Sequence, residues 1–422
     1  MFRFIHCADI HLDSPLRGLD RYPGAPVEEI RGATREALRN LIRLALDEQV
    51  AFVLIAGDVY DGDWKDYNTG LFFASEMARL RAAGIPVFLV RGNHDAASQI
   101  SRTLRLPDNV RELPTGAPGT FALEEHGVAI HGQGFAHREV REDLSAAFPE
   151  ARRGCFNIGL LHTNVVGGRP GHENYAPSTL GGLASKGYDY WALGHVHERA
   201  VLCEAPWVVF PGNIQGRHVR ETGEKGCTLV TVDGGEVLAV EHRALDVLRW
   251  AICDVTARLD DDAHALLDRV EDELRAARDS AGELPVAARV RVRGATRAHS
   301  TIVVEPARWR EEFRALAASF ADDRLWIEKV ELLTRSPVDD RRAARGDEAL
   351  GGLLGYIDEA ASSDEDLERL AGELADLRRK LPPETLSGDE GLDLQSPEAL
   401  RALLDDVRRL LVPRVLAGGD AP

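Results

Sequence analysis

Five short apolar runs in the first two hundred or so residues are each followed by side chains that bind metal ions or carry protons. Runs of this kind, rich in β-branched and aromatic residues, predict buried strands. In an open α/β sheet, ligand sites form beyond the carboxyl ends of the strands, so we expect the five ends to meet at one site. The polar residues that follow the runs are Asp9, His11, Asp58, Asp61, Asn93, His94, Asp95, His162, His195 and His197.

Aspartate, asparagine and histidine without cysteine suit divalent cations such as manganese, iron or zinc. A carboxylate can bridge two cations, and imidazole nitrogen and amide oxygen can complete each coordination shell. Two cations about 3.5–4 Å apart lower the pKa of a water between them and hold a phosphate for in-line attack. We therefore predict a phosphoester hydrolase. A nucleophilic triad is disfavoured because the five clusters contain no serine or threonine, and the sequence has no phosphate-cradling G-x-x-x-x-G-K-[ST] loop.

The order and spacing of these motifs resemble the signature of the calcineurin-like metallophosphoesterases. Any one of the histidines alone would equally suit an ordinary interior or surface position, but five in this order would not. Within that family, Phe4–Asp13 resembles the SbcD-type DNA repair nucleases, and Tyr188–His195 and Phe210–His218 are most similar to bacterial YhaO-like members. The resemblance is strong over residues 1 to about 245 and only architectural beyond. The motifs that carry it are Asp9-x-His11, Gly57-Asp58, Gly92-Asn93-His94-Asp95, His162 and Gly194-His195-Val196-His197.

The resemblance implies a centre of two divalent metal ions, with Mn²⁺ expected first and Fe²⁺ or Zn²⁺ also compatible. One ion would be held by Asp9, His11, Asp58 and His197. The other would be held by Asp58, Asn93, His162 and His195, with Asp58 bridging. His94 would face the phosphate, either stabilising its charge or protonating the leaving oxygen, and Asp95 would orient His94. Asp61 stands where some nuclease relatives carry a second catalytic histidine, so we expect it to brace its loop.

Four further residues on predicted loops are candidates for contact with the substrate. His172 lies on a polar loop after His162, where a surface role is the more common one. Arg217, His218 and Arg220 follow Pro211 and Gly212, and for them phosphate contact and plain solvation are equally expected.

The elements that must position these residues alternate along the chain up to about residue 245. Amphipathic helices are predicted over Glu28–Glu48 and Asn68–Ala83, and such helical crossovers indicate a partly parallel sheet. Beyond Asp95, short strands separated by glycine and proline indicate antiparallel additions. Together with the resemblance, this pattern predicts an α/β fold: a four-layer αββα sandwich of two mixed sheets over residues 1–245.

The rest of the chain is predicted to form two smaller parts. Residues 246–335 read as an α+β cap domain that the resemblance associates with positioning DNA. Residues 336–361 are polar and read as a linker, and residues 362–416 read as a pair of helices with leucine stripes. The stripes suit either packing on the body of the protein or receiving another protein's helix, and we favour the second because the pair follows a linker.

Composition limits the functions that this chain of 422 residues can have. It has no run of eighteen apolar residues and no basic, apolar leader, so we expect a cytoplasmic protein without a membrane span. Its five cysteines are scattered, which favours a reducing compartment and gives no thiolate metal site. The net charge of −18 repels nucleic acid, so DNA binding would need a local basic groove, bound cations or a second protein.

We therefore predict a metal-dependent DNA exonuclease or phosphodiesterase in DNA repair. It would work as the nuclease subunit beside an SMC-like coiled-coil ATPase that docks on the C-terminal helices. One alternative keeps the chemistry and changes the substrate to a small phosphodiester or a phosphoprotein, which the acidic surface favours. Another is a non-catalytic scaffold subunit of an ATPase complex, which the intact ligand set disfavours. The sequence leaves open whether two copies of the chain pair.

Overall fold

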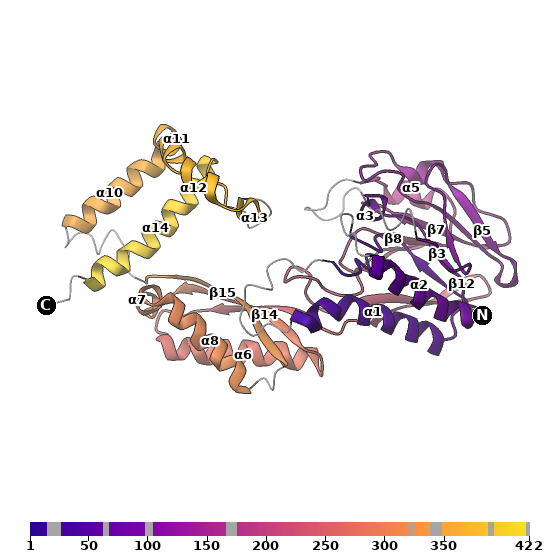
Figure 1. The fold of residues 1–422 in the computed structure, drawn as a ribbon, viewed down its shortest axis with the longest axis horizontal. Helices are drawn as coiled ribbons and strands as arrows, with labels where there is room; N and C mark the ends of the chain where they lie inside the picture. The colour runs from indigo at the N-terminus through magenta and orange to yellow at the C-terminus, as the bar shows by residue number, and fades with distance from the viewer. Residues whose placement is uncertain are drawn as a thin grey trace. The chain divides into compact units, whose positions relative to one another are not determined.

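The computed structural model describes residues 1–14, 27–61, 67–97, 104–165, 175–320, 324–337, 348–386 and 392–418. The chain divides into two compact units, shown in Figure 1 from indigo at the N-terminus to yellow at the C-terminus. The first unit comprises Met1–Ala251 with Ala281–Ala287, and the second comprises Ile252–Ser280 with Ala288–Pro422.

The first sheet of the first unit has six strands in the order β12-β11-β1-β2-β3-β4. Strands β1 to β4 run parallel to one another, whereas β11 pairs antiparallel with both β1 and β12. Their bounds are β1 Phe2–Cys7, β2 Phe52–Ile55, β3 Val87–Leu89, β4 Val110–Glu112, β11 Gly226–Asp233 and β12 Glu236–Ala244.

The second sheet also has six strands, in the order β5-β6-β7-β8-β10-β9. Its four central strands are parallel, and β5 and β9 add antiparallel edges. The bounds are β5 Gly119–Leu123, β6 Val128–Gln133, β7 Phe156–His162, β8 Tyr190–Gly194, β9 Ala200–Glu204 and β10 Trp207–Phe210. The parallel centre of each sheet brings several carboxyl strand ends to one edge.

The two sheets pack face to face through aromatic and aliphatic side chains. Phe4 stacks on Phe52 with 4.9 Å between ring centroids and meets Tyr190 of the other sheet edge-on at 5.3 Å. The next residue along β1, Ile5, is equally buried but points to the opposite face, as strand geometry requires. There it packs under helices α1 (Val27–Asp47) and α2 (Tyr67–Ala82), through residues such as Leu38, Leu41, Phe73 and Met77.

The outer face of the second sheet is covered more thinly. Trp191 and Leu161 pack there with Phe148 and with Leu183 of the short helix α5 (Leu180–Ala184). The predicted pair of mixed sheets with helices outside is therefore confirmed.

Most of the predicted α+β part, residues 246–335, lies in the second unit, and its residues 246–251 and 281–287 lie in the first. This part has a three-stranded sheet in the order β13-β14-β15. Along the chain, helix α6 connects β13 to β14, and helices α7 and α8 connect β14 to β15. The six-residue helix α7 was not expected from the sequence. The bounds are β13 Arg249–Thr256, α6 Ala263–Ala281, β14 Val286–Ala295, α7 His299–Val304, α8 Pro306–Phe320 and β15 Leu325–Arg335.

The C-terminal part has more helices than the predicted pair. Helix α10 (Glu348–Ser362) occupies much of the segment that we predicted to be a linker, and Leu350 and Leu354 on it pack against Val412 of α14 (Pro397–Gly418). The first predicted helix is broken at Leu374 into α11 (Asp364–Glu373) and α12 (Ala375–Lys380), and α13 (Pro383–Leu386) follows.

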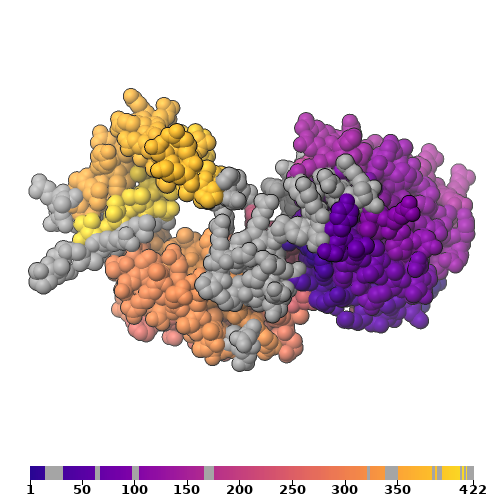
Figure 2. Space-filling view, in the orientation of Figure 1, coloured from indigo at the N-terminus to yellow at the C-terminus, as the bar shows by residue number. Residues whose placement is uncertain are grey.

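Exposed apolar side chains remain on these C-terminal helices. Among the side chains there whose burial is described, they are Tyr356, Leu377 and Val407, on the elements drawn in orange to yellow in Figure 2. Among the helices that the structure describes, none has both the length and the apolar character required to cross a membrane.

Candidate metal centre

The predicted ligands lie directly beyond the carboxyl ends of five parallel strands. Asp9 and His11 follow β1, Asp58 follows β2, and Asn93 begins the short helix α3 (Asn93–Ala97) after β3. From the second sheet, His162 ends β7, and His195 and His197 follow β8.

The backbone turns sharply where these ligands leave their strands. Asp9, His11 and Asp58 have φ angles of 52°, 45° and 54°, and His195 has a φ of 105°. Non-glycine residues rarely adopt positive φ, and such strain is maintained where the surrounding structure enforces it, commonly at functional sites. Four of the seven predicted ligands have a positive φ. This shared backbone strain supports a functional role for the strand ends.

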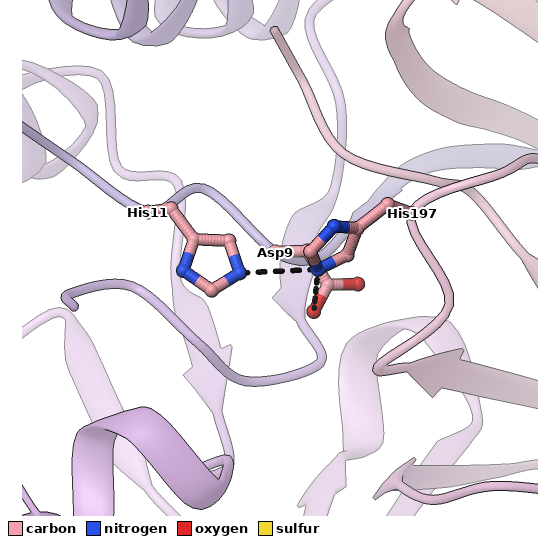
Figure 3. A group of neighbouring side chains, drawn as sticks. All are labelled: Asp9, His11 and His197. Atoms are coloured by element: carbon pink, nitrogen blue, oxygen red, sulfur yellow. Dashed lines mark hydrogen bonds and ion pairs between the residues drawn. The ribbon is translucent and has the colours of Figure 1, made fainter. Parts of the chain in front are cut away.

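One group of ligand atoms comes from Asp9, His11 and His197, which point toward one another in Figure 3. Nε2 of His11 lies 3.2 Å from Nε2 of His197, which lies 3.9 Å from Oδ1 of Asp9. The Nδ1 atoms of the two rings face carboxylates, Asp61 for His11 at 2.8 Å and Glu221 for His197 at 2.7 Å. Because Nδ1 donates in each neutral ring, both Nε2 atoms carry lone pairs directed at each other. A cation between them removes this repulsion, so the residues fit a metal ion.

A second group shows the same convergence of acceptors. Nδ1 of His162 donates to the backbone carbonyl of Ala56 at 2.9 Å, so its Nε2 is the unprotonated atom. That Nε2 lies 3.0 Å from Oδ1 of Asn93 and 3.5 Å from Oδ2 of Asp58. Three acceptors facing one another with no donor between them again fit a cation.

Asp58 lies between the two groups. Its Oδ1 accepts a hydrogen bond from the backbone N–H of His94 at 2.9 Å. Its Oδ2 faces His162 Nε2 at 3.5 Å and His11 Nε2 at 3.9 Å, one histidine from each group. This is the placement expected of a carboxylate shared by two ions.

Burial tunes these side chains for cation binding. Burial lowers the pKa of both His11 and His162 to about 3, so both rings are neutral near pH 7 and can act as ligands. Burial and the neighbouring charge of Asp58 raise the pKa of Asp9 well above its usual range. Two buried carboxylates at close quarters are costly unless positive charge compensates them.

His195 lies beside the second group. Its backbone N–H donates to both carboxylate oxygens of Asp9, at 3.0 and 3.2 Å, and ties β8 to the end of β1. Its ring lies edge-on to the His162 ring at 5.2 Å.

Glycines allow the two sheets to approach this closely. A Cβ at Gly194 would collide with the carbonyl oxygen of Ala56, and one at Gly92 would collide with Oδ1 of Asp58. The Gly-Asp, Gly-Asn-His and Gly-His motifs therefore leave room for the ligands beside them.

His94 lies at the edge of the group, where 35% of its side chain is exposed. Its Nδ1 is 3.3 Å from Oδ1 of Asp61, the same oxygen that accepts from His11. We expected Asp95 to orient His94, but the Asp95 carboxylate accepts backbone N–H groups of Val59, Tyr60 and Gly92 instead. The structure thus gives the orienting contact to Asp61.

Asp61 and Asp95 also differ in their ionisation. Burial tends to raise the pKa of Asp61, but the hydrogen bond from His11 and the charge of Arg217 lower it well below its usual range. Burial and the charge of Asp58 raise the pKa of Asp95 to about 7.

The predicted substrate contacts are placed less uniformly. Arg217 is 14% exposed, and its guanidinium lies 3.1 Å from Oε1 of Glu221 and 3.6 Å from Oδ1 of Asp61. His218 and Arg220 are exposed on the same loop. His172 lies outside the described residues.

Glu221, which contacts His197, was missed from the sequence. It follows no apolar run, and its partner lies 24 residues earlier, so no local signal identifies it.

Comparison with known proteins places these features in a family. Residues 2–199 match the family model described as "Calcineurin-like phosphoesterase", and residues 250–335 match "Metallophosphoesterase YhaO, middle domain". The chain is 34% identical over 373 residues to "Uncharacterized metallophosphoesterase YhaO" of Bacillus subtilis, covering 87% of this chain and 90% of that protein.

More distant relatives carry a more specific name. "DNA double-strand break repair protein Mre11" of Sulfurisphaera tokodaii is 25% identical over 264 residues, which cover 58% of this chain and 63% of that protein. The protein of the same name from Haloferax volcanii is 25% identical, with 64% and 58% covered. The matches thus span less than two thirds of these archaeal proteins. A solved dimetal phosphatase from Danio rerio aligns at 13% identity with a TM-score of 0.34, over 55% of this chain and 93% of its own.

Proposed function

Because this chain belongs to the calcineurin-like metallophosphoesterase family, in a branch with YhaO, we propose that it is a two-metal phosphodiesterase that degrades DNA in repair. The observation that carries the proposal is the set of ligand atoms from six residues, Asp9, His11, Asp58, Asn93, His162 and His197, that face one another with no donor between them. Asp9, His11, Asp58 and His197 would hold one ion, and Asp58, Asn93, His162 and His195 would hold the other. This intact arrangement disfavours a purely scaffolding role.

The chain's own residues divide the chemistry between them. When bound, two divalent cations, Mn²⁺ first and Fe²⁺ or Zn²⁺ as alternatives, supply the positive charge that activates water and offsets the charge of the phosphate. Asp58 fixes the spacing between the two ligand groups, and its Oδ1 is kept in place by the His94 N–H. The carboxylates and carbonyl behind His11, His197 and His162 keep each ring in one tautomer.

His94 serves the leaving group. Asp61 faces its Nδ1 at 3.3 Å, so Nδ1 keeps its proton, and the doubly protonated ring carries a second, transferable proton on Nε2 for the departing oxygen. Partial exposure of the ring suits contact with an incoming phosphate. His218 and Arg220, on an exposed loop, are candidates to contact neighbouring phosphates of the substrate.

DNA is the substrate that the relatives favour, since the archaeal proteins are named for DNA double-strand break repair. A net charge of −18 favours a second candidate, a small phosphodiester or a phosphoprotein. The two candidate functions use the same metal centre and differ only in the substrate that binds there.

A substrate panel separates them. We expect the purified chain with Mn²⁺ to shorten end-labelled single- or double-stranded DNA, and EDTA to abolish the activity. Bis(p-nitrophenyl) phosphate and a phosphopeptide serve as the small and protein substrates in the same buffer. If the protein hydrolyses either of these and leaves every DNA intact, the nuclease hypothesis is rejected. The hypothesis of a phosphoesterase acting on another substrate is then retained.

We further propose that the C-terminal helices bind an SMC-like coiled-coil ATPase through their apolar side chains, which include the exposed Tyr356, Leu377 and Val407. Because α10 packs on α14, a clean truncation must remove residues 348–422 together. We expect the truncated protein to lose binding to the coiled coil in a pull-down, while its hydrolysis of bis(p-nitrophenyl) phosphate stays within about twofold of the full chain, because the removed residues share no described partner with the proposed ligands. Retained binding would place the partner elsewhere.

A further inference from the structure

The segment Pro211–Glu221, called the mount below, packs beside the proposed metal ligand His197 and hydrogen-bonds to its backbone and its ring. The backbone N–H of Asn213 and the Nζ of Lys225 both donate to the carbonyl oxygen of His197, at 3.3 and 3.0 Å. Gly212, with φ of 79°, lies so close that a Cβ there would be 3.0 Å from the same oxygen. The loop after β10 is thus held against the loop after β8, which carries His197.

The mount is anchored on its far side as well. The side-chain amide of Gln215 donates to the carbonyl of Leu248 at 2.7 Å and accepts from the N–H of Val247 at 2.9 Å. Trp250 Nε1 donates to the carbonyl of Gly216 at 2.9 Å. Because side chains hold it on both sides, the segment can fix the position of what it carries.

The segment carries Glu221, a carboxylate that is only 6% exposed. Its Oε1 accepts from Nδ1 of His197 at 2.7 Å and from the Arg217 guanidinium at 3.1 Å. Its Oε2 accepts from Nδ2 of Asn213 at 2.9 Å and from the backbone N–H of Arg217 at 2.8 Å. Burial tends to raise the pKa of Glu221, but the hydrogen bond from His197 and the charge of Arg217 lower it well below its usual range.

We propose that Glu221 is the positioning residue of the His197 ligand, and that Arg217 joins it to Asp61, which positions His11 in the same way. The inference rests on the two-metal centre of the proposed function. A carboxylate at Nδ1 holds the proton there, directs Nε2 toward Asp9, and makes the ring a stronger donor to a cation.

Arg217 connects the two positioning carboxylates. Its guanidinium lies 3.1 Å from Glu221 and 3.6 Å from Asp61, so one cation partly neutralises both. This role replaces the phosphate contact that the sequence left open for Arg217, because its charge is already shared between the buried Glu221 and the partly buried Asp61.

The test is the affinity of the metal-free full chain for Mn²⁺, measured by isothermal titration calorimetry. We expect Glu221→Gln to weaken the binding of one of two ions by about 10–100-fold and to leave the other unchanged. Glu221→Asp keeps the charge but withdraws it by one methylene, and we expect the same loss at the same ion. Glu224→Gln is the matched control, because Glu224 lies on the same loop, is 56% exposed and pairs only with Arg249 among its described ion-pair partners.

A double-mutant cycle distinguishes positioning from a general effect on the fold. In a His197→Ala background, Glu221→Gln should cause no further loss of affinity, since the ring that it positions is gone. An equal loss with and without His197, or wild-type affinity in both Glu221 variants, would overturn the proposal. DNA cleavage plays no part in these titrations, so a protein that binds two ions and ignores DNA still decides the role of Glu221.

Discussion

Asp58→Asn is expected to lose more than about 10³-fold in hydrolysis while the metal-free protein becomes more stable than wild type. Asp58 Oδ2 faces a histidine of each ligand group, so an amide nitrogen there would turn hydrogens toward the space that a cation needs. Without metal, the charge of Asp58 disfavours ionised Asp9, whose pKa is raised by burial and by this neighbour. Removing that charge relieves repulsion that only a cation otherwise offsets.

Three measurements check this prediction. The turnover of bis(p-nitrophenyl) phosphate reports activity, calorimetry with Mn²⁺ reports the number of ions bound, and thermal unfolding with EDTA or Mn²⁺ reports stability. We expect Mn²⁺ to raise the melting temperature of wild type far more than that of Asp58→Asn. Asp108→Asn, at an exposed position 3.7 Å from Arg81, should behave as wild type. A variant that still binds two ions would show that Asp58 does not bridge them.

The ligand-bearing strand ends are predictable from the sequence because each ligand is adjacent in the chain to the strand that positions it. Val87–Leu89 is followed at once by the Gly-Asn-His-Asp motif, and the parallel order of β1, β2 and β3 brings such ends to one edge. The family expected from these motifs is confirmed by the relatives. Local pattern therefore suffices to predict that these candidate ligands lie close together.

Local pattern fails for the residues that hold the ligands from across the fold. Adjacency in sequence favoured Asp95 as the partner of His94, but both lie in helix α3, where neighbouring residues point about 100° apart. Asp95 therefore turns toward the backbone of Val59 and Tyr60, and Asp61 reaches His94 from the end of another strand. Glu221 meets His197 only because a separate loop is anchored beside it.

The helix α10 was missed for a different reason. It contains Gly351, Gly352 and Gly355, each of which costs about 1 kcal/mol of helix propensity relative to alanine. Packing of Leu350 and Leu354 on Val412 offsets that cost, and this contact joins positions some sixty residues apart. Helix propensity, which depends only on neighbouring residues, does not account for this long-range packing.

His94→Gln is expected to lose about 10²–10⁴-fold in DNA hydrolysis and to keep both metal ions. The ring contributes a proton at Nε2, and glutamine has no group that can release one near neutral pH. The ligands should stay in place because the contact of residue 94 with Asp58 is made by its backbone N–H, which glutamine retains. Activity and Mn²⁺ binding should therefore separate in this variant, whereas both are lost together in Asp58→Asn.

The size of the loss should depend on the leaving group, which identifies the role of the ring. A substrate with a p-nitrophenolate leaving group needs little protonation, so His94→Gln should impair its hydrolysis far less than that of DNA, whose leaving alkoxide is strongly basic. His126→Gln is the matched control, because that ring is 30% exposed and lies against Phe2 at the start of β1, at the opposite end from the ligands. Equal losses on both substrates would assign His94 to charge stabilisation of the phosphate instead of proton transfer, since that contribution does not depend on the leaving group.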